Sequence, residues 1–95
     1  MHEIGRITHY FPKASVAVVE LSAPLHVGNV IKIMGEGGSF TQEVGSMQIE
    51  HTQIAEATAG QSVGIKILEK AGPGSKVFRL EVEREASFPP MLVGK

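Results

Sequence analysis

The stretch ATAGQSVGIKI, residues 57–67, decides the fold class of this chain. After a turn of small residues, apolar and polar side chains alternate, with Val63, Ile65 and Ile67 on one side and Ser62, Gly64 and Lys66 on the other. A period of two is typical of a half-buried β-strand. A glycine in the middle of such a strand indicates a sharp bend or a close approach of another group to the backbone.

The flanking sequence contains five more segments with strand character. They are short, rich in β-branched residues and separated by turns that contain glycine, proline or asparagine. We expect strands near residues 3–10, 16–21, 30–33, 40–51 and 78–82. In the longest of these, a β-bulge near residues 45–46 keeps the apolar side chains on one face. Residues 54–59 are expected to be a short connection with one turn of helix.

These segments predict an all-β fold, a single small closed antiparallel β-barrel of about six strands. In this interpretation residues 1–84 form the barrel and residues 85–95 form an extended tail. Closure is expected because an open sheet this apolar exposes strand edges that aggregate. The apolar residues predicted to face the core are Val18, Ile31, Ile33, Val63, Ile65, Ile67, Phe78, Leu80 and Val82.

Composition places the chain among single-domain globular proteins. Its 95 residues are 42% hydrophobic and carry a formal net charge of −1, which argues against a nucleic-acid binder with a large basic field. There is no cysteine, so disulfides and thiolate metal sites are excluded. The first residues contain no apolar signal segment and no run is long enough to span a membrane, so a cytoplasmic location is expected.

Sequence motifs of enzymes are absent. The glycine-rich residues 35–39 lack the lysine of a phosphate-binding loop and precede a strand, which favours a hairpin loop. The four histidines, at positions 2, 9, 26 and 51, show none of the spacings of a zinc site. Because no nucleophile, base or metal cluster can be assembled, we predict a protein that is not an enzyme and has no cofactor, no metal and no catalytic residue.

The later part of the chain carries a cluster of basic residues. If the strands that contain Lys66 and Arg79 pair as a hairpin around residues 71–74, these two cations share one outer face. That arrangement favours contact with the phosphate groups of RNA. The alternative is an ordinary solvated surface on which Glu69 or Glu81 neutralises both cations.

Two adjacent aromatic residues, Tyr10 and Phe11, precede the turn that contains Lys13. Neighbouring side chains of an extended chain point to opposite faces, so only one of the two rings can be buried. The exposed ring beside a lysine suits stacking on a base or docking of a partner, and Tyr10 and Lys13 are therefore candidate RNA-binding residues. The alternative is that both rings wrap the end of the barrel.

Five segments occur in an order that resembles the second-domain β-barrel of translation GTPases, such as elongation factor Tu and the bacterial initiation factor that carries initiator tRNA. They are GRI (5–7), VAVVEL (16–21), LHVGNVIKI (25–33), VGSMQI (44–49) and AGQSVGI (59–65). Asn29 stands where that family usually has aspartate. The resemblance covers about residues 3–82, and a similar barrel ends collagenase-like peptidases, some of which act in RNA modification.

The resemblance implies a stand-alone, elongation-factor-like binding module without GTP binding, because the GTPase domain is absent. Its expected partner is tRNA or ribosomal RNA. The alternative is a protein-interaction subunit that docks on a larger peptidase-like or RNA-modifying enzyme. In that case the apolar residues Phe88, Met91 and Leu92 of the tail are candidate partner contacts, because an extended apolar segment can add to a sheet edge or fill a groove.

Overall fold

The computed structural model describes residues 2–81, which form ten β-strands and no helix. The all-β class is therefore confirmed. Two short strands, β3 (Leu25–His26) and β8 (Glu56–Ala57), pair with each other. The other eight build the main sheet: β1 (His2–Phe11), β2 (Val16–Leu21), β4 (Val30–Gly35), β5 (Gly38–Glu43), β6 (Met47–Ile49), β7 (Thr52–Ile54), β9 (Ser62–Lys66) and β10 (Lys76–Leu80).

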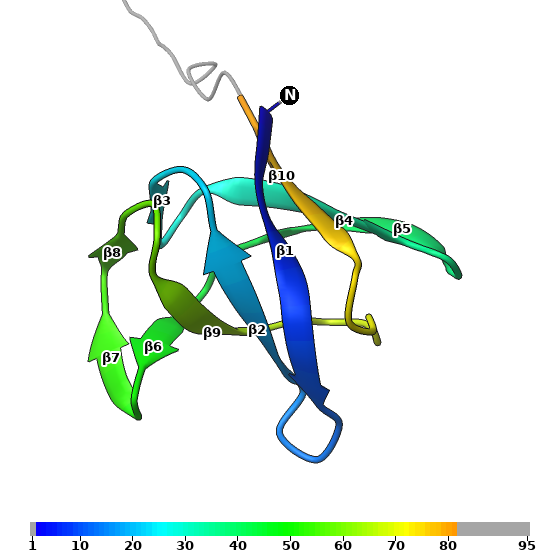
Figure 1. Ribbon diagram of the computed structural model, residues 1–95, viewed down its shortest axis with the longest axis horizontal. Helices are drawn as coiled ribbons and strands as arrows, with labels where there is room; N and C mark the ends of the chain where they lie inside the picture. The colour runs from blue at the N-terminus through cyan, green and yellow to red at the C-terminus, as the bar shows by residue number, and fades with distance from the viewer. Residues whose placement is uncertain (1, 82–95) are drawn as a thin grey trace, which may run out of the picture.

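The main sheet has the strand order β5-β4-β10-β1-β2-β9-β6-β7, and its pairings are antiparallel. Figure 1 shows the sheet curled around one interior, with β4 and β5 on one side and β6 and β7 on the other. The register of β1 shifts between Glu3 and Gly5 and again between Ile7 and His9. Such irregularities bend a strand, and they let the long β1 follow the curvature.

The interior of the curl is filled by side chains from one face of every long strand. Five of the predicted core residues are buried, namely Ile31, Ile33, Val63, Ile65 and Ile67. Val18 is only half-buried, because the inward residues of β2 are Ala17, Val19 and Leu21. β2 lies between β1 and β9, so its continuous apolar sequence reflects a central position rather than a second core.

The prediction of a closed barrel is wrong, because the hydrogen-bonded ladder ends at β5 on one side and at β7 on the other. Where β5 approaches the end of β9, the two segments are connected by hydrogen bonds of the Gln42 side chain instead of by a backbone ladder. Gln42 is 7% exposed; its Nε2 donates to the carbonyl oxygen of Lys66 at 3.0 Å, and its Oε1 accepts from the amide of Leu68 at 2.7 Å. One amide group thus spans the gap that strand pairing would close.

The predicted hairpin of β9 and β10 is also wrong, since β1 and β2 lie between these strands in the sheet. The inward residue of β10 is Val77, which is fully buried, whereas Phe78 and Leu80 are half-buried. A shift of one residue exchanges the two faces of a strand. Val77 and Phe78 are both apolar, so the alternation in the sequence did not distinguish them, and Val82 lies outside the described residues.

The segment predicted as one bulged strand over residues 40–51 is divided instead. β5 ends at Glu43, residues 44–46 connect the two strands, and β6 begins at Met47. β6 and β7 then form a hairpin through Glu50 and His51, whose φ angles are 50° and 67°. Two central residues with positive φ match the right-handed twist of the flanking strands.

Residues 54–59, predicted to include one turn of helix, hold the end of β7 and all of β8. Within residues 2–81 there is no helix long and apolar enough to cross a membrane; the cytoplasmic location stays a prediction. The predicted domain end at residue 84 and the tail at 85–95, with Phe88, Met91 and Leu92, lie outside the described residues.

Candidate functional site

Strands β1, β2, β9, β6 and β7 present one continuous exposed side, which we name the outer face. The strand register places His9, Val18, Gly64, Gln48 and Gln53 in one row across these five strands. A second row, of Phe11, Val16 and Lys66, runs beside it. Directly opposed residues of antiparallel strands point to the same side of a sheet. Side chains from distant parts of the sequence therefore meet here.

A hollow of about 340 Å³ lies on the outer face and brings together two of the predicted RNA-binding residues, Lys13 and Lys66. Lys13 comes from the turn between β1 and β2, and Lys66 from the end of β9. The other lining residues are Ala14, Val16, Ser46, Met47, Gln48, Gln53 and Gly64, so the lining contains two cations and no carboxylate. A protein with a net charge of −1 thus has a locally positive site.

The polar side chains of this hollow make no ion pair and no side-chain hydrogen bond with other residues in the part of the chain that the structure describes. There, neither lysine forms an ion pair, since both recorded pairs join a histidine to a glutamate. The side chains of Ser46, Gln48 and Gln53 likewise make no hydrogen bond to another described residue. Ammonium, amide and hydroxyl donors therefore all remain available to an anionic oxygen.

Gly64 forms part of the floor of the hollow. A Cβ atom built at this position would lie 3.2 Å from Cγ1 of Val16 and 3.5 Å from Cγ of Gln48. The expected close approach at this mid-strand glycine is therefore confirmed, and the neighbours are side chains of β2 and β6. The missing side chain leaves this part of the hollow open.

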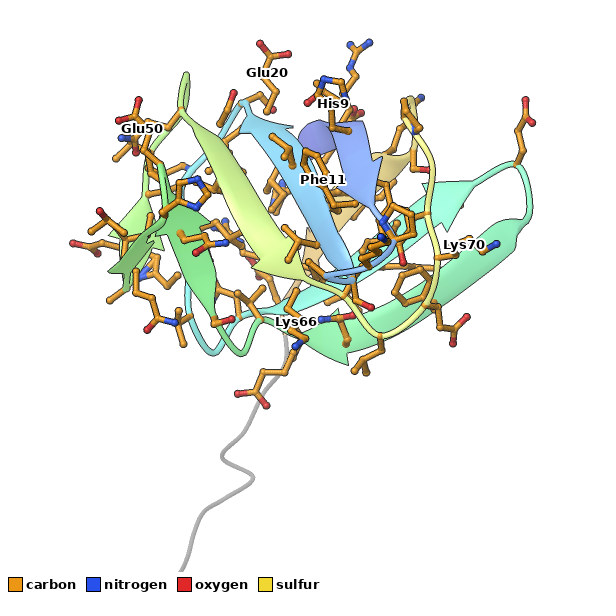
Figure 2. All side chains as sticks on the ribbon, turned by 90° about the horizontal axis from the view of Figure 1, so that it is seen from below. His9, Phe11, Glu20, Glu50, Lys66 and Lys70 are labelled. Carbon is orange, nitrogen blue, oxygen red and sulfur yellow. The ribbon has the colours of Figure 1, made fainter. Side chains whose placement is uncertain are left out.

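The exposed ring beside the turn is Phe11 rather than Tyr10. Phe11 is 52% exposed, whereas Tyr10 is half-buried and packs against the core. The ring of His9 lies beside Phe11, with a centroid distance of 6.1 Å and an angle of 36° between the planes. Figure 2 shows His9 and Phe11 toward one side of this face and Lys66 toward the other. Tyr10 was the ring predicted to stack on RNA, whereas its neighbour Phe11 is the exposed ring.

Arg79 lies far from this site. It pairs with His2 at the start of β1, whereas Lys66 pairs with Val16, which lies opposite Phe11 at the end of β1. The nine steps between His2 and Phe11 correspond to about 30 Å. Nη1 of Arg79 donates to the carbonyl oxygen of Pro24 at 3.0 Å, which gives this guanidinium a contact within the fold. Lys66 and Arg79 therefore do not share one binding site.

Two of the four histidines form exposed pairs with carboxylates. Nε2 of His2 lies 3.7 Å from Oε2 of Glu81, and Nδ1 of His26 lies 3.6 Å from Oε1 of Glu56. Neither pair is accompanied by a third ligand, since residues 2–81 contain no group of three histidine, aspartate or glutamate side chains able to hold a metal ion. These exposed pairs are typical of a solvated surface.

Comparison with known proteins relates the chain to parts of longer peptidase-like proteins. No protein-family model matches it. It is 38% identical over 80 residues to an uncharacterized protease of Methanocaldococcus jannaschii, an alignment that covers 83% of this chain and 20% of the protease. It is 33% identical over 84 residues to a collagenase of Porphyromonas gingivalis, which covers 86% of this chain and 23% of the collagenase. The chain spans about a fifth of the length of these relatives.

Solved structures share the fold. The C-terminal domain of a Geobacillus thermoleovorans protein named as a U32 peptidase superposes in two crystal structures, each with a TM-score of 0.79. The first, its selenomethionine variant, is 20% identical and is matched over 82% of this chain and 99% of the domain. The second is 19% identical, with 84% and 93% covered. The resemblance to the barrel of collagenase-like peptidases is thus supported, whereas none of these proteins is named as a translation factor.

Proposed function

We propose that the chain is a non-catalytic β module of a larger peptidase-like protein. The observation that carries this proposal is the 38% identity to a segment that makes up only 20% of a longer protease. We expect a domain of this size that recurs within much longer proteins to work together with the remainder of those proteins. We infer that the peptidase-like remainder is either joined to this module or bound by it as a separate subunit.

The chemistry of the described residues supports a binding role. Within residues 2–81, the histidine–carboxylate pairs His2–Glu81 and His26–Glu56 are exposed and lie on strands or at their ends rather than inside a cavity. Hydrolysis of a peptide bond needs an activated nucleophile or a metal-bound water, held close to a group that stabilises the oxyanion. We therefore assign the bond-breaking step to the remainder and positioning to this module.

Affinity capture tests this proposal. The tagged chain is used to recover bound proteins from the lysate of the cells that produce it, with and without ribonuclease, and the proteins are identified by mass spectrometry. Recovery of a protein similar to the remainder of the two relatives, unchanged by ribonuclease, supports the proposal. The proposal is contradicted if no such protein is recovered and an antibody against the chain detects no longer polypeptide that contains it in the same lysate.

A second candidate function, contact with tRNA or ribosomal RNA, is favoured by the outer face. Exposed Phe11 offers a ring on which a base can stack, and Lys13 and Lys66 offer two cations for phosphate. The two functions are compatible if the larger protein acts on RNA. Binding of tRNA that weakens as salt rises supports this candidate, and binding that is undetectable at low salt removes it.

A further inference from the structure

We propose that the free edge of β5 binds an extended polypeptide segment of the peptidase-like remainder, which adds to the sheet as a further strand. This inference rests on the proposed function and names the surface that would carry it. It concerns the side of the molecule on which the ladder stays open, where β4 and β5 reach away from the other strands (Figure 1).

The first argument is the direction of the backbone groups on β5. The amide of Val44 donates to the carbonyl of Asn29 at 2.8 Å, across the extension of the β4–β5 pair. In an antiparallel pair every second residue is hydrogen-bonded to its partner. Gln42 and Phe40 are in step with Val44 and turn toward β4, so Ser39 and Thr41 turn their N–H and C=O groups outward. No hydrogen bond to these groups is recorded from another part of residues 2–81.

The second argument is that this edge is unprotected from Gly38 to Thr41, before Gln42 contacts the chain that leaves β9. Proteins shield free strand edges by making them very short, or with lysine, proline or a bulge. The other free edge, β7, has three residues, which makes it a poor template. β5 has six residues, GSFTQE, with neither lysine nor proline, and its pairing with β4 is regular from Gly38 to Glu43. An edge of this kind is stable against misassembly when another strand covers it.

The third argument is a hollow beside this edge. It has a volume of about 520 Å³ and lies between the β4–β5 hairpin and residues 69–75. Ile33 and Phe40 contribute apolar side chains to its lining. Gly37, Gly38 and Gly72 also line it, and they have no side chain that would fill it. A strand added to β5 would direct every second side chain to the side on which Phe40 lies. The hollow provides room for one such side chain.

The outward backbone groups of β5 indicate an extended polypeptide as the occupant, and the proposed function indicates which one. Alternating N–H and C=O groups at the spacing of a strand are complementary to another extended backbone, and the main-chain hydrogen bonds supply the affinity. The tail of this chain is a poor candidate, because Pro89 and Pro90 lack the N–H groups that a ladder needs. An extended segment of the larger protein therefore fits this edge, and the tail and a second copy become outcomes of the test.

The test compares Thr41→Pro with Thr41→Ala in the full chain. Proline at this position removes an outward N–H while leaving the N–H groups that bond to β4, and alanine retains the outward N–H. The probe is the peptidase-like protein recovered by affinity capture. We expect Thr41→Ala to bind it like the wild type and Thr41→Pro to bind at least about tenfold more weakly, which corresponds to about 1.4 kcal/mol. Thermal unfolding of both variants checks that the fold is retained.

Hydrogen exchange of the wild-type chain keeps the proposal testable if Thr41→Pro fails to fold. The amides of Ser39 and Thr41 are expected to exchange rapidly in the free chain and slowly in the complex. Equal binding of both variants, or no protection of these two amides, overturns the proposal while capture of the larger protein still supports the proposed function. Protection already present in the free chain assigns the edge to a second copy or, if deletion of residues 86–95 abolishes it, to the tail; either result overturns the proposal.

Discussion

The side-chain oxygen of Gln42 accepts a hydrogen bond from the backbone amide of Leu68 at 2.7 Å, where β5 meets the chain that leaves β9. The same side chain donates to the carbonyl oxygen of Lys66 at 3.0 Å. These two bonds imitate one rung of a β-ladder. The glutamine is buried, whereas Leu68 is 79% exposed. The hydrogen bond therefore connects a buried side chain of β5 to an exposed residue of the chain after β9.

Replacement of Gln42 by alanine is predicted to destabilise the fold. The change removes these two hydrogen bonds and a longer third one, from Nε2 to the carbonyl oxygen of Glu43 at 3.3 Å. It leaves partly buried backbone groups of Lys66 and Leu68 without their partner, which costs about 1–3 kcal/mol. For a domain of this size, each kcal/mol lowers the midpoint of thermal unfolding by about 4–8 °C. Glu43→Ala, at the exposed neighbouring position, is the control and should unfold within about 0.5 kcal/mol of the wild type.

Replacement of Gly5 by alanine is predicted to destabilise the sheet more than the same change at Gly37. A Cβ atom on Gly5 would clash with the carbonyl oxygen of Glu20 and lie 3.0 Å from Cγ1 of Val19, both on the paired strand β2. Such crowding costs about 1–3 kcal/mol. Nothing lies within 4 Å of the position that a Cβ atom would take on Gly37. Urea unfolding measures both variants, and equal stabilities would refute the packing argument.

Removal of the two lysines of the outer face is predicted to weaken any binding of RNA in a salt-dependent manner. In the double variant Lys13→Ala, Lys66→Ala, tRNA affinity falls and the slope of log affinity against log salt becomes shallower by up to about two phosphate contacts. Arg79→Ala is the control, because Arg79 lies elsewhere and bonds to Pro24. If the double variant keeps the wild-type slope, the hollow does not contact phosphate.

The isolated chain is predicted to have no peptidase activity. Both histidine–glutamate pairs are exposed, and residues 2–81 contain no group of three histidine, aspartate or glutamate side chains that could hold a metal ion. The proposed binding role therefore leaves the cleavage of peptide bonds to the larger protein. Gelatin and a mixture of synthetic peptides are the substrates, incubated with the chain in the presence and absence of added divalent metal. Cleavage that co-purifies with the chain and is lost in a His26→Ala variant would overturn the assignment of a binding role.

The sequence predicts where strands lie along the chain better than which strands are neighbours in the sheet. Alternation at Val63, Ile65 and Ile67 identifies an inward face, because local periodicity reflects local burial. It carries no information on which strands are neighbours, and for this reason the separation of β9 from β10 was not predicted. Closure was expected from the apolar composition, but the pairing ends at β5, where the buried amide of Gln42 makes the contact.

For the candidate site, too, the sequence indicates individual residues but not which of them lie together. Lys13 and Lys66 were separate candidates in the sequence, and the register of β2 with β9 brings them to one hollow. Arg79 was paired with Lys66 only through a hairpin that does not exist. Tyr10 was chosen as the candidate ring, yet Phe11 is the exposed one, because adjacent aromatic residues give no sign of which one faces inward. That choice depends on the register shift between Ile7 and His9, which is a tertiary feature.

The native size of the chain in the cells that produce it tests the central claim most directly. Lysate treated with ribonuclease is separated by size-exclusion chromatography, and the chain is followed with an antibody on native and denaturing gels. We expect it at a mass far above its own 10.2 kDa, either within one long polypeptide or together with a peptidase-like protein. Elution of the ribonuclease-treated chain as a free 10.2 kDa species would contradict the claim that it is a module of a larger protein.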